Sequence, residues 1–201
     1  MIKKRTRDGD NKAVTHVTID LTKDNPFARV FRAHQESLYS KAMAGIGRIA
    51  AEVARLEFVL DTIGWRLVGE LDTYTIFTER MTTGTKAQRV QQLAESLLPD
   101  GDTKDQVKGL CEETRNLLHG RNDAIHSMYI DEPLGGLIRM KFPGGGPPKE
   151  VDPEDLFALA ERISELVKEN ADAERLVNQA MADRREAAIA LSKTVQTKKK
   201  R

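Results

Sequence analysis

The chain has 201 residues, of which 39% are hydrophobic and 31% are charged, a balance typical of one globular domain. No stretch approaches the roughly 20 consecutive apolar residues of a membrane-spanning helix, so no membrane partner is expected. The N-terminus lacks the apolar segment of a secretory signal, and the single cysteine, Cys111, excludes an intrachain disulfide. The expected location is therefore the cytoplasm.

The net charge of +1 is unevenly distributed along the chain. Four basic residues lie within residues 1–7 and four more form residues 198–201, and neither segment contains an acid. Without these eight positive charges, the net charge of +1 becomes −7 for residues 8–197. Any attraction for nucleic acid must therefore come from the chain ends or from a local basic patch.

The first half of the chain predicts a polar arm followed by helices. Residues 1–35 form the arm, in which the alternation over residues 14–21 indicates a short strand and Asn25-Pro26 is expected to break the chain. Apolar residues at spacings of three and four predict a long helix over residues 38–68. A second helix is expected around residues 90–97, after a break at Thr82-Thr83-Gly84.

The second half predicts a third helix, capped by Asp102 or Thr103 and reaching about His126. Residues 127–131 and 137–142 suit a small hairpin, and residues 143–148 a loop. Asp152 is expected to cap a long last helix with Pro153 at its first position. The fold class is thus an all-α bundle of four to five helices, with the hairpin inserted before the last long helix and a basic tail at residues 191–201.

Two charged residues fall on apolar helical faces. At about 100° per residue, Arg121 lies in the apolar sector of the third helix, and Glu57 lies between Val53 and Leu60 on the first. An arginine cannot lose its charge, so it needs an acidic partner, a ligand or a wet interface. We expect Glu57 and Arg121 either to form a structural ion pair or to line a polar site between the two helices.

A polar row accompanies these charges on the third helix, formed by Arg115, His119, Asn122 and His126. On an ideal helix, Arg121 and His126 point about 140° apart. Both would reach one substrate if the helix unwinds after Asn122, or if a second copy of the helix contributes across a two-fold axis. A histidine near a helix C-terminus also serves as a partner of the helix dipole.

No metal or cofactor is expected. The sequence contains no HExxH, paired CxxC, phosphate-binding glycine loop or GxSxG motif. His119 and His126 lie two helical turns apart, about 10.5 Å along the axis, which is too far for both to ligate one ion at about 2 Å.

The segment Arg121-Asn122-Asp123-Ala124-Ile125-His126 resembles the signature of the HEPN superfamily of helical-bundle proteins, an arginine followed after four to six residues by a histidine. The first-helix segment 54–60, the second helix and the hairpin with its capped helix supply the surrounding context. Together they cover residues 40–180. The resemblance implies that residues 36–190 form a HEPN-like helical domain.

The resemblance also implies a metal-independent endoribonuclease that acts as a homodimer. His126 would move a proton while a ribose 2′-hydroxyl attacks the neighbouring phosphate, leaving a cyclic phosphate. Arg121 would hold that phosphate, since its planar donors suit a growing anion. Asn122 would orient the histidine or donate to the phosphate, and Glu57 would fix Arg121 or His126.

RNA and a second copy of the chain are the partners that follow from the resemblance. A toxin or defence role would add an antitoxin or regulatory protein. One toxin branch has a tyrosine, two residues after the histidine, that its antidote modifies. Here Tyr129 lies three residues after His126, so modification of Tyr129 is not expected.

Two other functions stay open. The chain would otherwise be a non-catalytic helical RNA- or protein-binding module with a structural Glu57–Arg121 pair, or it would hold a nucleotide between its helices. The polar side of the first helix has a basic row that would serve RNA or form an ordinary solvated face. This row comprises Lys41, Arg48, Arg55 and Arg66.

Overall fold

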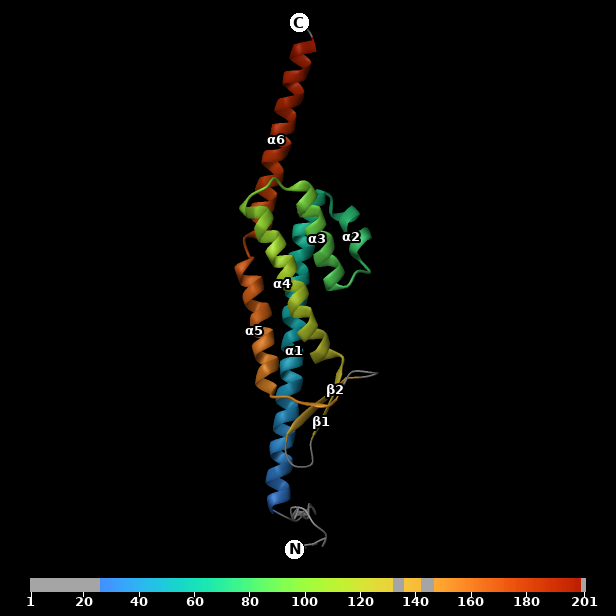
Figure 1. Cartoon of the computed structure of the whole chain (residues 1–201), viewed down its shortest axis with the longest axis vertical. Coiled ribbons are helices and arrows are strands. Elements are labelled where there is room, and N and C mark those ends of the chain that lie inside the picture. The colour runs from blue at the N-terminus through green and yellow to red at the C-terminus, as the bar shows by residue number, and fades with distance from the viewer. Residues whose placement is uncertain (1–25, 132–135, 142–146, 200–201) are drawn as a thin grey trace, which may run out of the picture.

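The computed structural model describes residues 26–131, 136–141 and 147–199 (Figure 1). The strand predicted over residues 14–21 lies outside these ranges. Helix α1, Pro26–Val68, starts well before the predicted residue 38. Proline is tolerated at the first helical position because its missing N–H would have no partner there. Pro26 therefore begins α1, and the prediction that residues 26–35 belong to a polar arm is wrong.

The described part of the chain is mostly helical, as predicted. After α1 come α2, Leu71–Thr78, and α3, Thr83–Leu97, and then α4, Asp102–Ile125. Helix α2 was not predicted. The start of α4 also differs from the prediction, because Gly101, at φ 144°, is the N-cap residue and no side chain caps the helix.

The predicted last helix is two helices, α5, Pro153–Glu169, and α6, Ala173–Lys199. As predicted, Asp152 caps α5 by accepting a hydrogen bond from the Glu154 amide at 3.0 Å. The break follows Asn170, whose side-chain amide donates to the carbonyl of Leu166 at 2.9 Å and ends α5. Helix α6 then continues beyond the bundle and takes in residues 191–199 of the predicted tail (Figure 1).

Helix α1 is the central element of the bundle. It packs against α3 and α4 and against α5 and α6, and α4 packs in turn on α3 and α5 (Figure 1). The core consists mainly of aliphatic side chains at helical spacing, which leave water as the helices meet. Its largest fully buried members include Ile49, Leu56, Leu60, Ile63, Leu67, Val90, Val107, Leu110 and Ile163.

A small antiparallel sheet follows α4. Strand β1, Ser127–Asp131, pairs with β2, Leu137–Lys141, as the predicted hairpin requires. A third strand, β3, Lys149–Glu150, pairs with β2 and was not predicted. Residues 132–135 and 142–146, which include the three consecutive glycines, lie outside the described ranges. The sheet places β2 beside the C-terminal end of α4.

Candidate functional site

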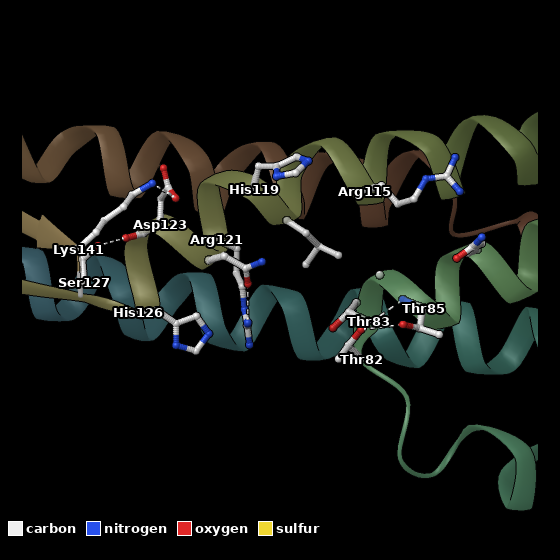
Figure 2. Close-up of a pocket in the computed structure, with 14 residues that line it drawn as sticks. Thr82, Thr83, Thr85, Arg115, His119, Arg121, Asp123, His126, Ser127 and Lys141 are labelled. Atoms are coloured by element: carbon white, nitrogen blue, oxygen red, sulfur yellow. Dashed lines mark hydrogen bonds and ion pairs between the residues drawn. The ribbon is translucent and has the colours of Figure 1, made fainter. Parts of the chain in front are cut away.

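A cavity of about 730 Å³ lies between the start of α3, the C-terminal part of α4 and the end of β2 (Figure 2). Its wall contains the whole polar row predicted on the third helix. The lining residues on α4 and at its end are Arg115, Leu118, His119, Arg121, Asn122, Asp123, His126 and Ser127. The remaining wall is formed by Thr82, Thr83, Gly84, Thr85, Gln88 and Lys141.

Arg121 is anchored to its neighbour in the sequence. Its Nη1 donates to Asn122 Oδ1 at 2.9 Å. The Nε atom of Arg121 is buried and has no hydrogen-bond partner within the described residues. A buried donor without an acceptor is costly. Asn122 occupies Nη1, and no hydrogen bond is made by Nη2 within the described residues, so Nη2 is the guanidinium nitrogen left for an anion in the cavity.

His126 is the C-cap residue of α4, and its backbone N–H donates to the carbonyl of Asn122 at 3.0 Å. The helix thus stays regular through Ile125 and does not unwind after Asn122. Even so, Arg121 and His126 line the same cavity, and in Figure 2 both side chains point away from α4 in the same direction. Unwinding after Asn122 is therefore not what brings the two side chains to one cavity, and the contribution of a second copy stays a prediction.

Glu57 does not line the cavity, and no ion pair joins it to Arg121 within the described residues. Instead, its carboxylate accepts a hydrogen bond from Thr83 Oγ1 at 2.7 Å. The predicted Glu57–Arg121 pair is therefore wrong, because a helical wheel gives the direction of a side chain and not its partner. The hydrogen bond between Glu57 and Thr83 links α1 to the first turn of α3, which forms one wall of the cavity.

The start of α3 forms that wall, at residues 82–84, which were predicted only to break the chain before the second helix. Thr82 is the N-cap residue, and its hydroxyl accepts from the Thr85 amide at 3.3 Å. The first amides of a helix have no partners within the helix and favour anions. The threonine at the N-cap position was the signal in the sequence that would have indicated this helix start.

The opposite end of the cavity is formed by Asp123 and Lys141, an ion pair between α4 and β2 (Figure 2). Arg139 lies 3.9 Å from the same carboxylate. The hydrogen bond from Lys141 holds the pKa of Asp123 below its ordinary value, and the nearby positive charges act in the same sense. Lys141 was missed as a site residue because it follows the motif in a different element.

Tyr129 faces away from this chemistry. Its side chain is 8% exposed, and its hydroxyl donates to the carbonyl of Ala124 at 2.9 Å. Burial raises the pKa of this hydroxyl. A buried hydroxyl with its hydrogen bond made is poorly placed for modification.

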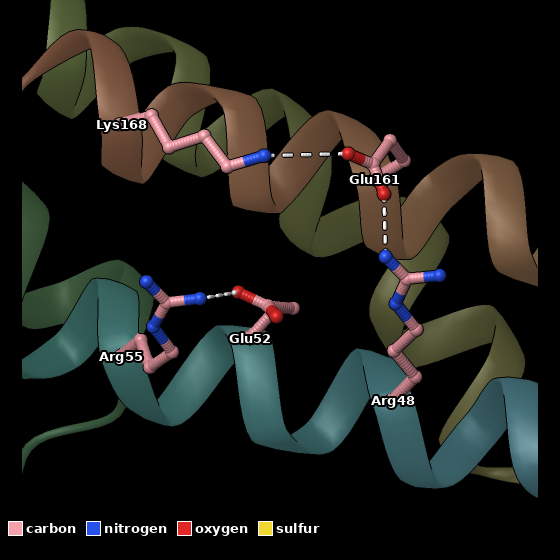
Figure 3. Close-up of polar contacts among 5 residues, drawn as sticks. All are labelled: Arg48, Glu52, Arg55, Glu161 and Lys168. Atoms are coloured by element: carbon pink, nitrogen blue, oxygen red, sulfur yellow. Dashed lines mark hydrogen bonds and ion pairs between the residues drawn. The ribbon is translucent and has the colours of Figure 1, made fainter.

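The three arginines of the basic row on α1 are paired with acids. Arg48 pairs with Glu161 of α5 at 2.5 Å, and Arg55 pairs with Glu52 on its own helix at 2.9 Å (Figure 3). Arg66 pairs with Glu174 of α6 at 2.8 Å. These contacts favour an ordinary solvated face over an RNA-binding row.

The structure was also inspected for metal-binding clusters and membrane-spanning helices, and the chain was compared with known proteins. The described ranges contain no cluster of three or more His, Cys, Asp or Glu side chains arranged to hold a metal ion. None of their helices is both long and apolar enough to span a membrane. The chain matches no family model, no curated protein and no solved structure.

Proposed function

We propose that the protein is a metal-independent endoribonuclease of the HEPN type that acts as a homodimer. The observation behind this proposal is that Arg121, Asn122 and His126 line one cavity. The same arrangement, an imidazole beside a guanidinium, suits proton transfer at a phosphodiester.

In the proposed reaction, His126 accepts the proton of a ribose 2′-hydroxyl. The freed oxygen attacks the adjacent phosphorus, and the bond from phosphorus to the 5′-oxygen of the next nucleotide breaks. The leaving oxygen then takes up a proton, so the products are a 2′,3′-cyclic phosphate and a 5′-hydroxyl. Arg121 stabilises the charge that develops on the phosphate oxygens, and Asn122 holds Arg121 in place through its side-chain carbonyl.

The local charge of the cavity supports an anionic substrate. Arg115, Arg121 and Lys141 oppose the single acid Asp123, which leaves a net charge of +2 with both histidines neutral. The start of α3 adds the positive end of a helix dipole. This local field is opposite in sign to that of residues 8–197 as a whole, whose net charge is −7.

The homodimer is part of the proposal because the leaving oxygen needs a proton donor as well as a base. A second His126, contributed by a second copy, would supply that proton. Large apolar side chains on α1 and α2 offer such a copy a surface to bury: Phe58 is 72% exposed, Ile76 75% and Phe77 68%.

Cleavage of a pool of structured and unstructured RNA in EDTA tests the proposal. Wild-type protein should cut and leave cyclic phosphate ends, and His126→Ala and Arg121→Ala should each lose at least about a hundredfold in rate. The matched controls are His34→Ala and Arg55→Ala, which remove the same residue types from exposed positions of α1. A substrate with 2′-deoxyribose at every position should stay intact.

Two outcomes would contradict the proposal. Cleavage that stops in EDTA would assign the chemistry to a metal. Wild-type protein that cuts no RNA, but still binds it, would favour the non-catalytic RNA-binding module. Thermal unfolding of each variant separates loss of chemistry from loss of fold.

A further inference from the structure

The residues that line the cavity run along α4 from Arg115 to its C-terminal end, and the basic side chains among them are spread over this length. Figure 2 shows Lys141 and Asp123 at one end, Arg121 close to them along α4 and Arg115 toward the other end. The first turn of α3 lies across the cavity from α4, between the positions of Arg121 and Arg115. The cavity is thus a trough with one cation near each end and Arg121 between them, nearer to the end formed by Asp123 and Lys141.

The spacing of these groups exceeds one nucleotide. Arg115 and Asp123, which holds Lys141, are separated by eight positions of a regular helix, or about 12 Å at 1.5 Å per residue. A stacked nucleic-acid strand advances about 3.4 Å per nucleotide. The two ends of the trough are therefore separated by the length of about three to four stacked nucleotides.

The end groups are available to a ligand. The Arg115 side chain makes no hydrogen bond or ion pair with any residue in the described part of the chain, although it is partly buried against the cavity. Lys141 shares the single carboxylate of Asp123 with Arg139, so two cations face one acid at that end. Each end therefore has one positive charge in excess.

We propose that the trough binds the backbone of one RNA strand over several consecutive phosphates, with Arg121 at the scissile phosphate and Arg115 and Lys141 at phosphates on either side. The identity of the strand as RNA rests on the proposed function, whereas the multiple phosphate contacts rest on the layout of the trough. Arg115 and Lys141 are binding residues in this scheme, and the proton transfer stays with His126.

Binding of 2′-O-methyl oligouridines to the full chain tests this inference without cleavage, because a methylated 2′-oxygen cannot attack. Affinity should rise steeply with length up to about four nucleotides and slowly thereafter. Arg115→Gln and Lys141→Gln should each weaken binding of the six-nucleotide probe about fivefold and lower the slope of log affinity against log salt by about 0.7. Arg55→Gln removes a charge outside the trough and should change neither quantity.

The kinetic counterpart separates binding from chemistry. On a cleavable RNA, Arg115→Gln and Lys141→Gln should raise KM while kcat stays within about twofold of wild type. His126→Ala should instead lower kcat.

The results also separate the two proposals. If both glutamine variants bind the six-nucleotide probe with the affinity and salt slope of wild type, the multiple-phosphate trough is refuted, whether or not the protein cuts RNA. If binding depends on Arg115 and Lys141 but no RNA is cut, the nuclease proposal fails and the trough stands. Wild-type protein that binds no oligouridine refutes the multiple-phosphate trough, and the nuclease proposal is then decided by cleavage of the RNA pool alone.

Discussion

Gly64 is the position where adding one methyl group should show most directly how α2 is held against α1. A Cβ at Gly64 would overlap the ring of Tyr74, including its hydroxyl oxygen at 2.5 Å. Tyr74 is 3% exposed, and its hydroxyl donates to Asp61 Oδ1 at 3.2 Å. Gly64→Ala must therefore displace a buried ring.

The magnitude follows from three contributions. Replacing a helical glycine by alanine contributes about 1 kcal/mol of stability through helix propensity. Overpacking a buried contact costs about 1–3 kcal/mol, and loss of the Tyr74–Asp61 hydrogen bond costs about 1 kcal/mol more. The net effect of Gly64→Ala should be a loss of about 2 kcal/mol, or about 4–8 °C in Tm for a chain of this size.

The same helix offers a matched control. Nothing lies within 4 Å of a Cβ at Gly47, so Gly47→Ala should gain up to about 1 kcal/mol from propensity alone. Urea and thermal unfolding of both variants measure the two signs. In a Tyr74→Ala background, Gly64→Ala should turn neutral or stabilising. A Gly64→Ala that remains destabilising there, or that matches Gly47→Ala in the wild-type background, would refute the reasoning.

Three further predictions concern a thiol, a helix cap and an ion pair. Burial raises the pKa of the Cys111 thiol to about 12. The thiol therefore stays protonated in the folded chain at pH values where it loses its proton in the unfolded chain. Stability should fall as pH rises above about 9, and a thiol reagent at pH 8 should label Cys111 only on unfolding; rapid labelling of folded protein would contradict this. Asp152→Ala removes the cap of α5 and should cost about 1 kcal/mol in urea unfolding, whereas an unchanged midpoint would show that the cap contributes nothing. Lys141 lowers the pKa of Asp123, so the stability due to this pair should be present above the ordinary pKa and lost as pH falls through the lowered one. A carboxyl NMR titration should place Asp123 below about 3.9 and return it toward that value in Lys141→Gln; an Asp123 midpoint that does not move would exclude the pair as the cause.

Helices with a continuous buried stripe were predictable from the sequence, and the departures have physical causes. Helix α2 was missed because Leu71, Ile76 and Phe77 are exposed, so its apolar residues form no inward-facing period. The turn between α5 and α6 was missed because Leu166, Asn170, Ala173 and Val177 are all buried at spacings of three and four. The helical period passes through the turn unchanged, and no glycine or proline marks it.

The candidate site also has a part that was predictable from the sequence and a part that was not. Arg121, Asn122 and His126 share one helix and its cap, so their spacing in the sequence was enough to group them. Contacts between side chains on different helices or strands could not be predicted from sequence spacing. The partner of Glu57 is Thr83, which begins another helix, and Lys141 reaches the cavity from a strand.

Helix α1 is the first described element of the chain, yet its most extensive packing partner is α5, which is translated much later. At about 5–20 residues per second, synthesis of the segment from Val68 to Pro153 takes on the order of ten seconds. During this interval, the apolar stripe of α1 has no α5 to cover it, and it is open to chaperones and to other nascent chains.

The residues that line the cavity all lie between Thr82 and Lys141, within the segment that is synthesised between α1 and α5. On the ribosome, α3 and α4 emerge and meet as near neighbours in sequence, which favours early local contacts. The long-range packing of α5 on α1 and α4 comes later, and that of α6 on α1 later still. The side chains that line the cavity are thus synthesised early, whereas their final rigidity depends on a helix that leaves the ribosome after all of them.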